Sequence, residues 1–177
     1  RSRGLGDVYK RQLYNRDQDT FSNYFYKENG YKATVTCIAP MNKDYLMLGT
    51  TSGVLLFDIG KERILNDTLP HPLHLLRPTA MVRQSDKIYI GVEKGLYVYS
   101  LANGTLEKLV DMPKATRIHS VFCQMFTRIW IATEGEGLYM YDTKSKELKN
   151  YRHEDGYSGL NSNYVRSLSL IHISEPT

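Results

Sequence analysis

The chain of 177 residues carries 23 lysine and arginine residues against 19 aspartate and glutamate residues, a formal net charge of +4, and two cysteines. This length is sufficient for one domain with a hydrophobic core, and no apolar run approaches the length of a membrane span. The basic residues form no patch typical of nucleic-acid binding, so we expect neither a nucleic-acid partner nor a membrane segment.

The two ends of the chain are related to each other through their codons. Residues 3–12 and residues 168–177 in reverse order can be encoded, pair by pair, by complementary codons; Asp7 as GAT, for example, complements Ile173 as ATC. The implied DNA resembles the transposon adaptor used in shotgun library preparation. We therefore expect residues 1–12 and 168–177 to be translated adaptor, the alternative being a basic arm and an apolar strand. These ends hold four of the basic and two of the acidic residues, which leaves a net charge of +2 elsewhere.

One sequence pattern recurs through the rest of the chain. Two short apolar runs joined by a glycine-bounded turn begin at Leu46, at Ile88 and at Ile129. An aromatic residue precedes the polar end of each copy, with spacings of 43, 42 and 42 residues, at four positions: Tyr14, Phe57, Tyr99 and Tyr141. A period of this length is typical of a propeller blade or of a two-helix repeat.

The second apolar run of each copy decides between strands and helices. Val54–Phe57, Leu96–Tyr99 and Leu138–Tyr141 are too short for buried helices and are apolar at every position, so we expect strands buried on both faces. One further run precedes each copy and another follows it after a polar turn, as after Asn103-Gly104. Four strands per period make a blade. The predicted fold is all-β, a partial β-propeller of four-stranded blades that does not close.

The repeat divides the chain into blades. We expect the end of a truncated blade at 13–32, three complete blades, and the first strand of a further blade at 162–167. The complete blades are predicted at 33–76, 77–116 and 117–161. Because a closed propeller covers every blade, the terminal blades of an open array should expose apolar faces.

Few residues indicate a metal, disulfide, sugar-binding or glycosylation site. His71 and His74 flank a proline and lack further ligands at metal spacing, so we expect an inter-blade loop there and no metal site. Cys37 and Cys123 are interpreted as two unbridged apolar side chains. Trp130 could stack on a sugar, but its place in the repeat favours packing between blades. Asn103 matches a glycosylation sequon, as does Asn66, and is better explained as a turn residue.

A ligand of a propeller binds at the loops that join the second to the third strand and at the connections between blades. The candidate residues on these loops are Lys94, Glu134, Glu136 and Tyr157, and the alternative is a solvated rim. Glu134, Glu136 and the segment 153–155 also supply carboxylates that acid–base catalysis could use. No nucleophile accompanies them, so we predict no catalytic residue and no cofactor.

The third copy carries a family resemblance. The segment from Ile129 to Asp142, then Leu148–Tyr151 and Gly159–Ser167, resembles the two-component regulator propeller repeat. The likeness is weaker at 33–67 and 77–111, where Met47 and Tyr89 stand in place of tryptophan, and Ala132 replaces the usual glycine.

The resemblance implies the extracytoplasmic, periplasmic sensor of a hybrid two-component histidine kinase, with other blades of the same parent chain as partners. It also implies recognition of a glycan-derived signal such as an oligosaccharide, and a parent that could be a dimer. The kinase itself would lie outside this chain. Two other functions stay open, namely a free-standing protein- or glycan-binding propeller and a propeller lyase or hydrolase. The parent reading frame would distinguish the kinase sensor from the free-standing propeller.

Overall fold

The computed structural model describes residues 11–15, 20–24, 27–28, 31–65, 69, 71–125, 127–153 and 159–168. These residues form sixteen β-strands and one four-residue helix. The chain divides into two units, residues 1–77 and 78–177, which are described in turn.

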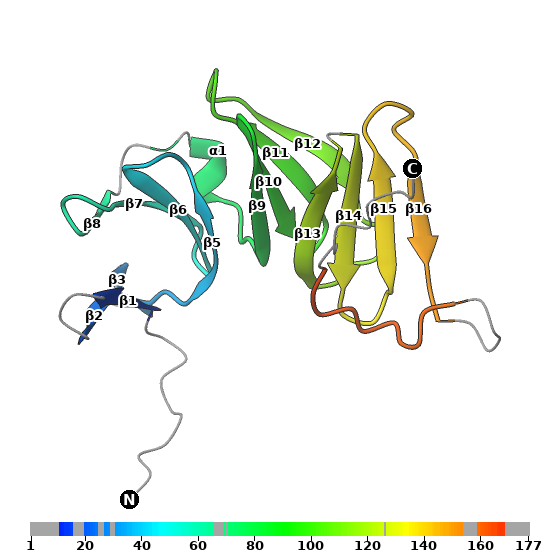
Figure 1. Ribbon diagram of the computed structural model, residues 1–177, viewed down its shortest axis with the longest axis horizontal. Coiled ribbons are helices and arrows are strands. Elements are labelled where there is room, and N and C mark those ends of the chain that lie inside the picture. Colours follow the sequence, from blue (N-terminus) through cyan, green and yellow to red (C-terminus); the bar gives the residue numbers. More distant parts are fainter. Residues whose placement is uncertain are drawn as a thin grey trace, which may run out of the picture. The chain divides into compact units, whose positions relative to one another are not determined.

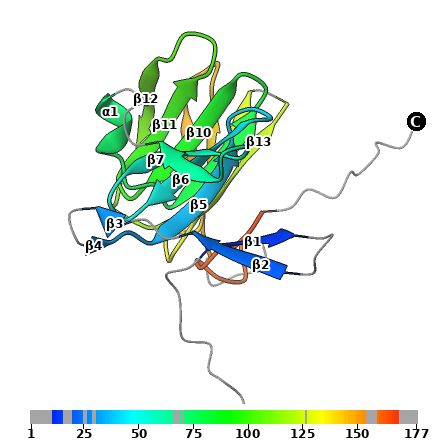
Figure 2. The same ribbon diagram turned by 90° about the vertical axis from the view of Figure 1, so that its left-hand side faces the viewer.

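The first unit contains two short hairpins and one four-stranded antiparallel sheet. Strand β1 (Arg11–Asn15) pairs with β2 (Thr20–Tyr24), and β3 (Lys27–Glu28) pairs with β4 (Tyr31–Lys32). The sheet has the order β5-β6-β7-β8, in which consecutive strands are neighbours. Figure 2 shows β5, β6 and β7 side by side. The bounds of the four strands are β5 Val35–Pro40, β6 Tyr45–Thr50, β7 Val54–Asp58 and β8 Arg63–Leu65.

The turn between β6 and β7 is held by a buried threonine. The Thr50 hydroxyl donates to the Gly53 carbonyl oxygen at 2.8 Å and accepts from the backbone N–H groups of Ser52 and Gly53. Gly53 has a φ of 149°, and a Cβ there would collide with the carbonyl oxygen of His74. The glycine is therefore required both for the backbone angle and for the close approach of the next segment.

That segment differs from the solvated loop predicted around His71 and His74. It forms helix α1 (His71–His74), whose Leu73 is completely buried and whose His74 Nε2 lies 3.1 Å from the Leu69 carbonyl oxygen. Pro72 is compatible with this helix because a proline in the first turn lacks only an N–H that has no partner inside the helix. Buried leucine and local hydrogen bonding thus turn the predicted loop into a helical turn.

The second unit consists of two four-stranded antiparallel sheets, each with its strands in chain order (Figure 1). The first comprises β9 (Ala80–Gln84), β10 (Lys87–Val92), β11 (Gly95–Ser100) and β12 (Leu106–Asp111). The second comprises β13 (Ile118–Gln124), β14 (Arg128–Thr133), β15 (Leu138–Asp142) and β16 (Leu148–Tyr151). Each sheet is a meander of consecutive hairpins, as expected of a blade.

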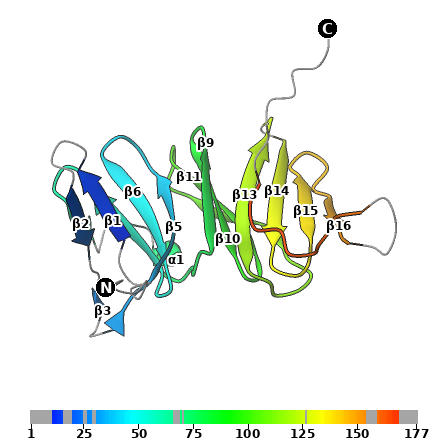
Figure 3. The same cartoon turned by 60° about the horizontal axis from the view of Figure 1, so that its bottom comes forward.

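These two sheets pack face to face and enclose the core of the second unit (Figure 3). Alternate residues of β14 and β15 point into this core, and all are at most 4% exposed. From the facing sheet, Tyr89, Leu96 and Val98 complete the contact. The buried residues of β14 and β15 are Ile129, Ile131, Tyr139 and Tyr141.

The predicted fold class is confirmed. Each four-stranded sheet lies within one of the predicted repeats, and Asn103-Gly104 forms a turn in which Gly104 has a φ of 68°. Strand β1 includes Arg11 and Gln12, since the register of the hairpin extends to the pair Arg11 and Tyr24; the adaptor origin of these residues stays a prediction. One detail differs. The predicted strand at 162–167 is reduced to a single bridge at Tyr164. The described residues provide no second strand to complete its ladder.

Candidate functional site

Three of the four predicted ligand residues lie on one edge of the second unit. Lys94 is exposed in the β10–β11 turn, and Glu134 and Glu136 lie in the β14–β15 turn. The connection 112–117 is bonded to both turns: the Met112 N–H donates to the Lys94 carbonyl, and the Thr116 hydroxyl donates to the Glu134 carbonyl. One connection therefore joins the two turns into a continuous polar edge, which we call the rim.

Glu136 is the most enclosed acidic residue of the rim, and its side chain is 17% exposed. Arg152 Nη1 donates to Glu136 Oε2 at 2.8 Å, and Lys114 Nζ lies 3.4 Å from Oε1. Burial raises the pKa of the neighbouring Tyr139 phenol, and the negative charge of Glu136 raises it further. Glu136, in the β14–β15 turn, thus contacts both Lys114 before the sheet and Arg152 after it.

Glu134 faces a different partner. Its Oε2 atom lies 3.9 Å from His119 Nε2, and its side chain is 47% exposed. The two carboxylates of this turn therefore each contact a basic side chain. This arrangement differs from a pair of carboxylates that share one reaction centre.

The segment after the last sheet is hydrogen-bonded to the β14–β15 turn. The Asn163 carbonyl accepts from the N–H groups of Gly135 at 3.1 Å and Gly137 at 2.8 Å, and its Oδ1 accepts from the His153 N–H at 2.7 Å. His153 Nδ1 lies 2.6 Å from the Leu160 carbonyl oxygen. Tyr157, the fourth predicted ligand residue, lies outside the described residues, so its relation to the rim stays a prediction.

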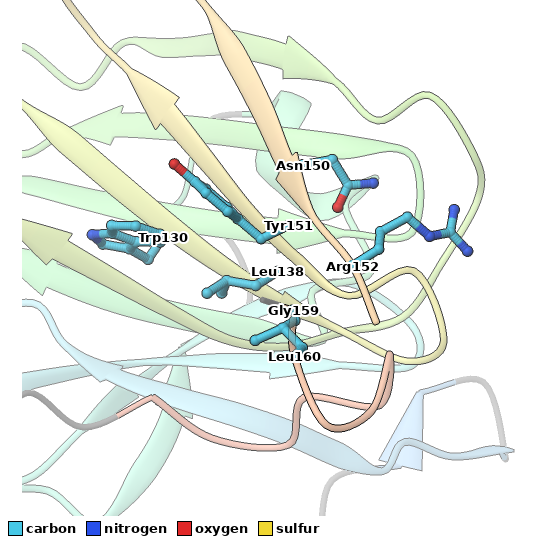
Figure 4. A pocket seen from close by; sticks show the side chains of 7 residues that line it. All are labelled: Trp130, Leu138, Asn150, Tyr151, Arg152, Gly159 and Leu160. Carbon is cyan, nitrogen blue, oxygen red and sulfur yellow. The ribbon is translucent and has the colours of Figure 1, made fainter. Parts of the chain in front are cut away.

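A hollow of about 430 Å³ lies beside the rim on the outer face of sheet β13–β16. Figure 4 shows the Tyr151 ring extending beside Trp130, whereas the Arg152 guanidinium points away. The ring centroids of Trp130 and Tyr151 are 5.8 Å apart, and Trp130 Nε1 donates to Gln124 Oε1 at 2.9 Å. The lining residues are Trp130, Leu138, Asn150, Tyr151, Arg152, Gly159 and Leu160.

The structure also bears on metal and thiol chemistry. Within the described ranges, no group of three or more His, Cys, Asp or Glu side chains is arranged to hold a metal ion. Neither Cys37 nor Cys123 forms a disulfide, and burial raises the pKa of the Cys123 thiol to about 12. Over the same ranges, no helix is both long and apolar enough to cross a lipid bilayer.

Sequence reasoning missed three residues of the rim, namely Lys114, Arg152 and Asn163. Lys114 and Arg152 lie in irregular connections, where sequence spacing does not predict which side chains meet. Asn163 had a usable signal, because it belongs to the Asn-Tyr-Val segment of the repeat. Its Oδ1, which accepts from the His153 N–H, explains why a polar residue stands at that position.

No protein-family model and no curated protein matches the sequence. Solved structures do share its fold. The extracellular domain of the hybrid two-component system BT4673 from B. thetaiotaomicron, also described as a one-component system, is 19% identical with a TM-score of 0.73. The match covers 90% of this chain and 22% of that domain. The extracellular domain of the hybrid two-component system BT3049 from the same organism is 23% identical with a TM-score of 0.58, over 80% of this chain and 21% of that domain.

A third structure with this fold is the computationally designed Ika4 protein, 18% identical with a TM-score of 0.50, over 75% of this chain and 79% of that one. At these identities the likeness shows the fold. The chain spans about a fifth of the length of the two extracellular domains. Those domains belong to the class of protein that the sequence resemblance indicated.

Proposed function

We propose that this chain is part of the extracytoplasmic sensor region of a hybrid two-component histidine kinase and takes part in recognising a glycan-derived signal. The observation that carries the proposal is the agreement of two independent likenesses. The third copy of the repeat resembles the two-component regulator propeller in sequence, and the fold is shared with extracellular domains of two hybrid two-component systems. Other blades of the same parent chain would complete the propeller.

The rim is the proposed ligand-binding edge. It combines an exposed lysine, a half-exposed carboxylate and the Glu136 ion pairs on loops, which is where function concentrates in such folds. Hydroxyl groups of an oligosaccharide are recognised by charged and amide side chains of this kind. The proposed role is binding without catalysis, since both carboxylates of the turn contact basic side chains rather than each other.

The parent reading frame provides the first test. We expect it to encode further blades of this repeat, then a membrane-spanning helix and a kinase domain. A reading frame that stops after a single closed propeller would contradict the sensor proposal and favour a free-standing binding protein.

A binding assay tests the rim. In the parent extracytoplasmic region, Lys94→Ala and Glu134→Gln should each weaken binding on an oligosaccharide array about tenfold, as loss of a charge-assisted hydrogen bond does. Lys144→Ala is the matched control, because Lys144 is an exposed lysine in the β15–β16 turn at the opposite end of the strands. Equal effects of Lys94→Ala and Lys144→Ala would remove the rim as the binding edge.

A further inference from the structure

A second hollow, of about 320 Å³, lies between the two sheets of the second unit, at the end of the strands opposite the rim. Lys87, which begins β10, lies on one wall, and Thr143 and Lys146, in the connection that follows β15, lie on the other. Every residue that lines it belongs to this unit, so the hollow does not depend on a further blade.

Two buried phenols line this hollow. Tyr89 of β10 is 6% exposed and Tyr141 of β15 is 4% exposed. Within the described ranges, no hydrogen bond joins either hydroxyl to another group of the protein. Burial raises the pKa of both phenols, so each keeps its proton at neutral pH and can donate. Buried tyrosine hydroxyls normally have a hydrogen-bond partner, and an unpaired one beside a hollow indicates that the partner enters from the hollow.

The repeat shows that packing does not require these two hydroxyl groups. Met47 and Trp130 occupy the repeat position of Tyr89, and Phe57 occupies that of Tyr141. Met47 is completely buried and Phe57 is 7% exposed, so both positions can be filled in a blade without a phenol. The ring at each position serves the fold, whereas the hydroxyl is a polar group that the fold does not use.

Two lysines and one glutamate add charge to the hollow. Lys87 and Lys146 are exposed, and over the described part of the chain their ammonium groups form no ion pair. Glu107 of β12 is the lining carboxylate, and its charge adds to burial in raising the pKa of Tyr141. The hollow therefore offers two ammonium groups and two phenols as donors, with one carboxylate as acceptor.

A third lysine of the lining contributes no charge to the hollow. The Lys108 ammonium forms an ion pair with Asp111, and its Nζ lies 5.7 Å from the centroid of the Tyr97 ring. Tyr97 alternates with Val98 along β11, so it lies on the other face of the sheet. The Lys108 ammonium is thus directed away from the phenols.

We propose that this hollow binds a small hydroxycarboxylate, at a site separate from the rim. The carboxylate would accept from Lys87 and Lys146, and the hydroxyl groups would accept from the two phenols and donate to Glu107. An anion without hydroxyl groups would leave the Glu107 carboxylate facing it without a donor, which disfavours simple anions. A volume of about 320 Å³ is in the range of sites for small organic ligands.

Calorimetric titration of the full chain with D-gluconate tests the proposal, and D-glucitol is the matched probe in which a hydroxymethyl group replaces the carboxylate. We expect gluconate to bind with a dissociation constant of about 1 mM, and glucitol to bind at least about tenfold more weakly, because it lacks the charge that the lysines attract. Absence of gluconate binding at about ten times that concentration would overturn the proposal, as would equal affinity for the two probes.

The phenols are tested by removing only their hydroxyl groups. Tyr89→Phe and Tyr141→Phe should each weaken gluconate binding about tenfold. The thermal unfolding midpoint of the ligand-free protein should stay unchanged or rise, since an unpaired buried hydroxyl is lost. Tyr97→Phe makes the same change on the other face of the sheet and should leave binding unchanged. A lower midpoint for Tyr89→Phe or Tyr141→Phe would show that the hydroxyls serve the fold, and unchanged binding would remove them from the site; either result contradicts the proposal.

The lysines are tested by removing their charge. Lys87→Gln and Lys146→Gln should each weaken gluconate binding about fivefold to tenfold and leave the weaker binding of glucitol unchanged. Lys144→Gln is the matched control, because Lys144 is exposed in the same connection as Lys146 and does not line the hollow. An equal loss with Lys144→Gln would mean that gluconate responds to the overall charge of the protein, and the proposed site would be rejected.

Discussion

The two faces of sheet β13–β16 are built from alternate residues of the same strands, and yet they differ in exposure. Ile129 and Ile131 are at most 1% exposed, whereas Trp130 between them is half-buried. Both faces are apolar, so residue type does not cause the difference. It arises because the preceding sheet covers one face. Burial of an apolar side chain in an array of blades therefore depends on whether a neighbouring blade packs on it.

The largest expected effect comes from truncation on the covered face. Ile131→Ala should lower the free energy of unfolding by about 2–5 kcal/mol, because it leaves a cavity between two packed sheets. Leu138→Ala is the matched change on the open face and should cost about 1 kcal/mol, since water reaches part of that site. Urea unfolding monitored by circular dichroism measures both. Equal costs would contradict the distinction between the faces.

Overpacking of the covered interface gives the next effect. Gly91→Ala should cost about 1–3 kcal/mol, because its Cβ would lie 2.9 Å from Ile118 Cγ2. Combining Gly91→Ala with Ile118→Val should recover most of the loss, because valine is smaller than isoleucine by one methylene. Thermal unfolding of the single and double variants gives the coupling free energy between positions 91 and 118. A double variant no more stable than Gly91→Ala alone would show that the two positions do not compensate.

The covered face also carries a thiol whose ionisation affects stability. Burial raises the pKa of Cys123 to about 12, whereas a thiol in an unfolded chain ionises near pH ~8.5. Rising pH therefore deprotonates the unfolded state first, so the free energy of unfolding should fall between these two values and lose about 1–2 kcal/mol by pH 10. Below this window the contribution of Cys123 to stability is fully present.

Urea unfolding at a series of pH values measures this loss, and Cys123→Ala is the control. Tyr89 and Tyr139 of the same core ionise in both proteins, and the charge of Cys123 also raises the pKa of Tyr89, so the difference between the two slopes reports the thiol together with this coupling. Parallel slopes would mean that Cys123 is not protected by the interface.

The smallest effect is expected for Tyr151 on the open face. Tyr151→Ala should cost about 0.5–1 kcal/mol in this chain, mainly through loss of its ring contact with Trp130. Urea titrations of the protein with and without the change measure this cost, and a cost as large as that of Ile131→Ala would contradict the distinction between the two faces.

Local features of the sequence predicted much of the fold. The aromatic period, the apolar four-residue runs and the glycine-bounded turns located the second and third strands of each sheet to within one residue, because alternation and turn chemistry act over a few neighbours. Helix α1 was missed. Its cause is the burial of Leu73 and the acceptance of a hydrogen bond by Leu69, which depend on the path of the chain.

The candidate site likewise combines residues that the sequence predicted with contacts that it did not predict. Lys94, Glu134 and Glu136 were predicted from the repeat, because a position in a repeat determines its loop. That Glu136 contacts Lys114 and Arg152 was decided only by the tertiary structure, which brings together side chains 22 and 16 residues away from it along the chain. The sequence by itself determined which residues belong to blades, since periodicity is local. Only the tertiary structure decided which apolar face is covered, since cover requires a second sheet at contact distance.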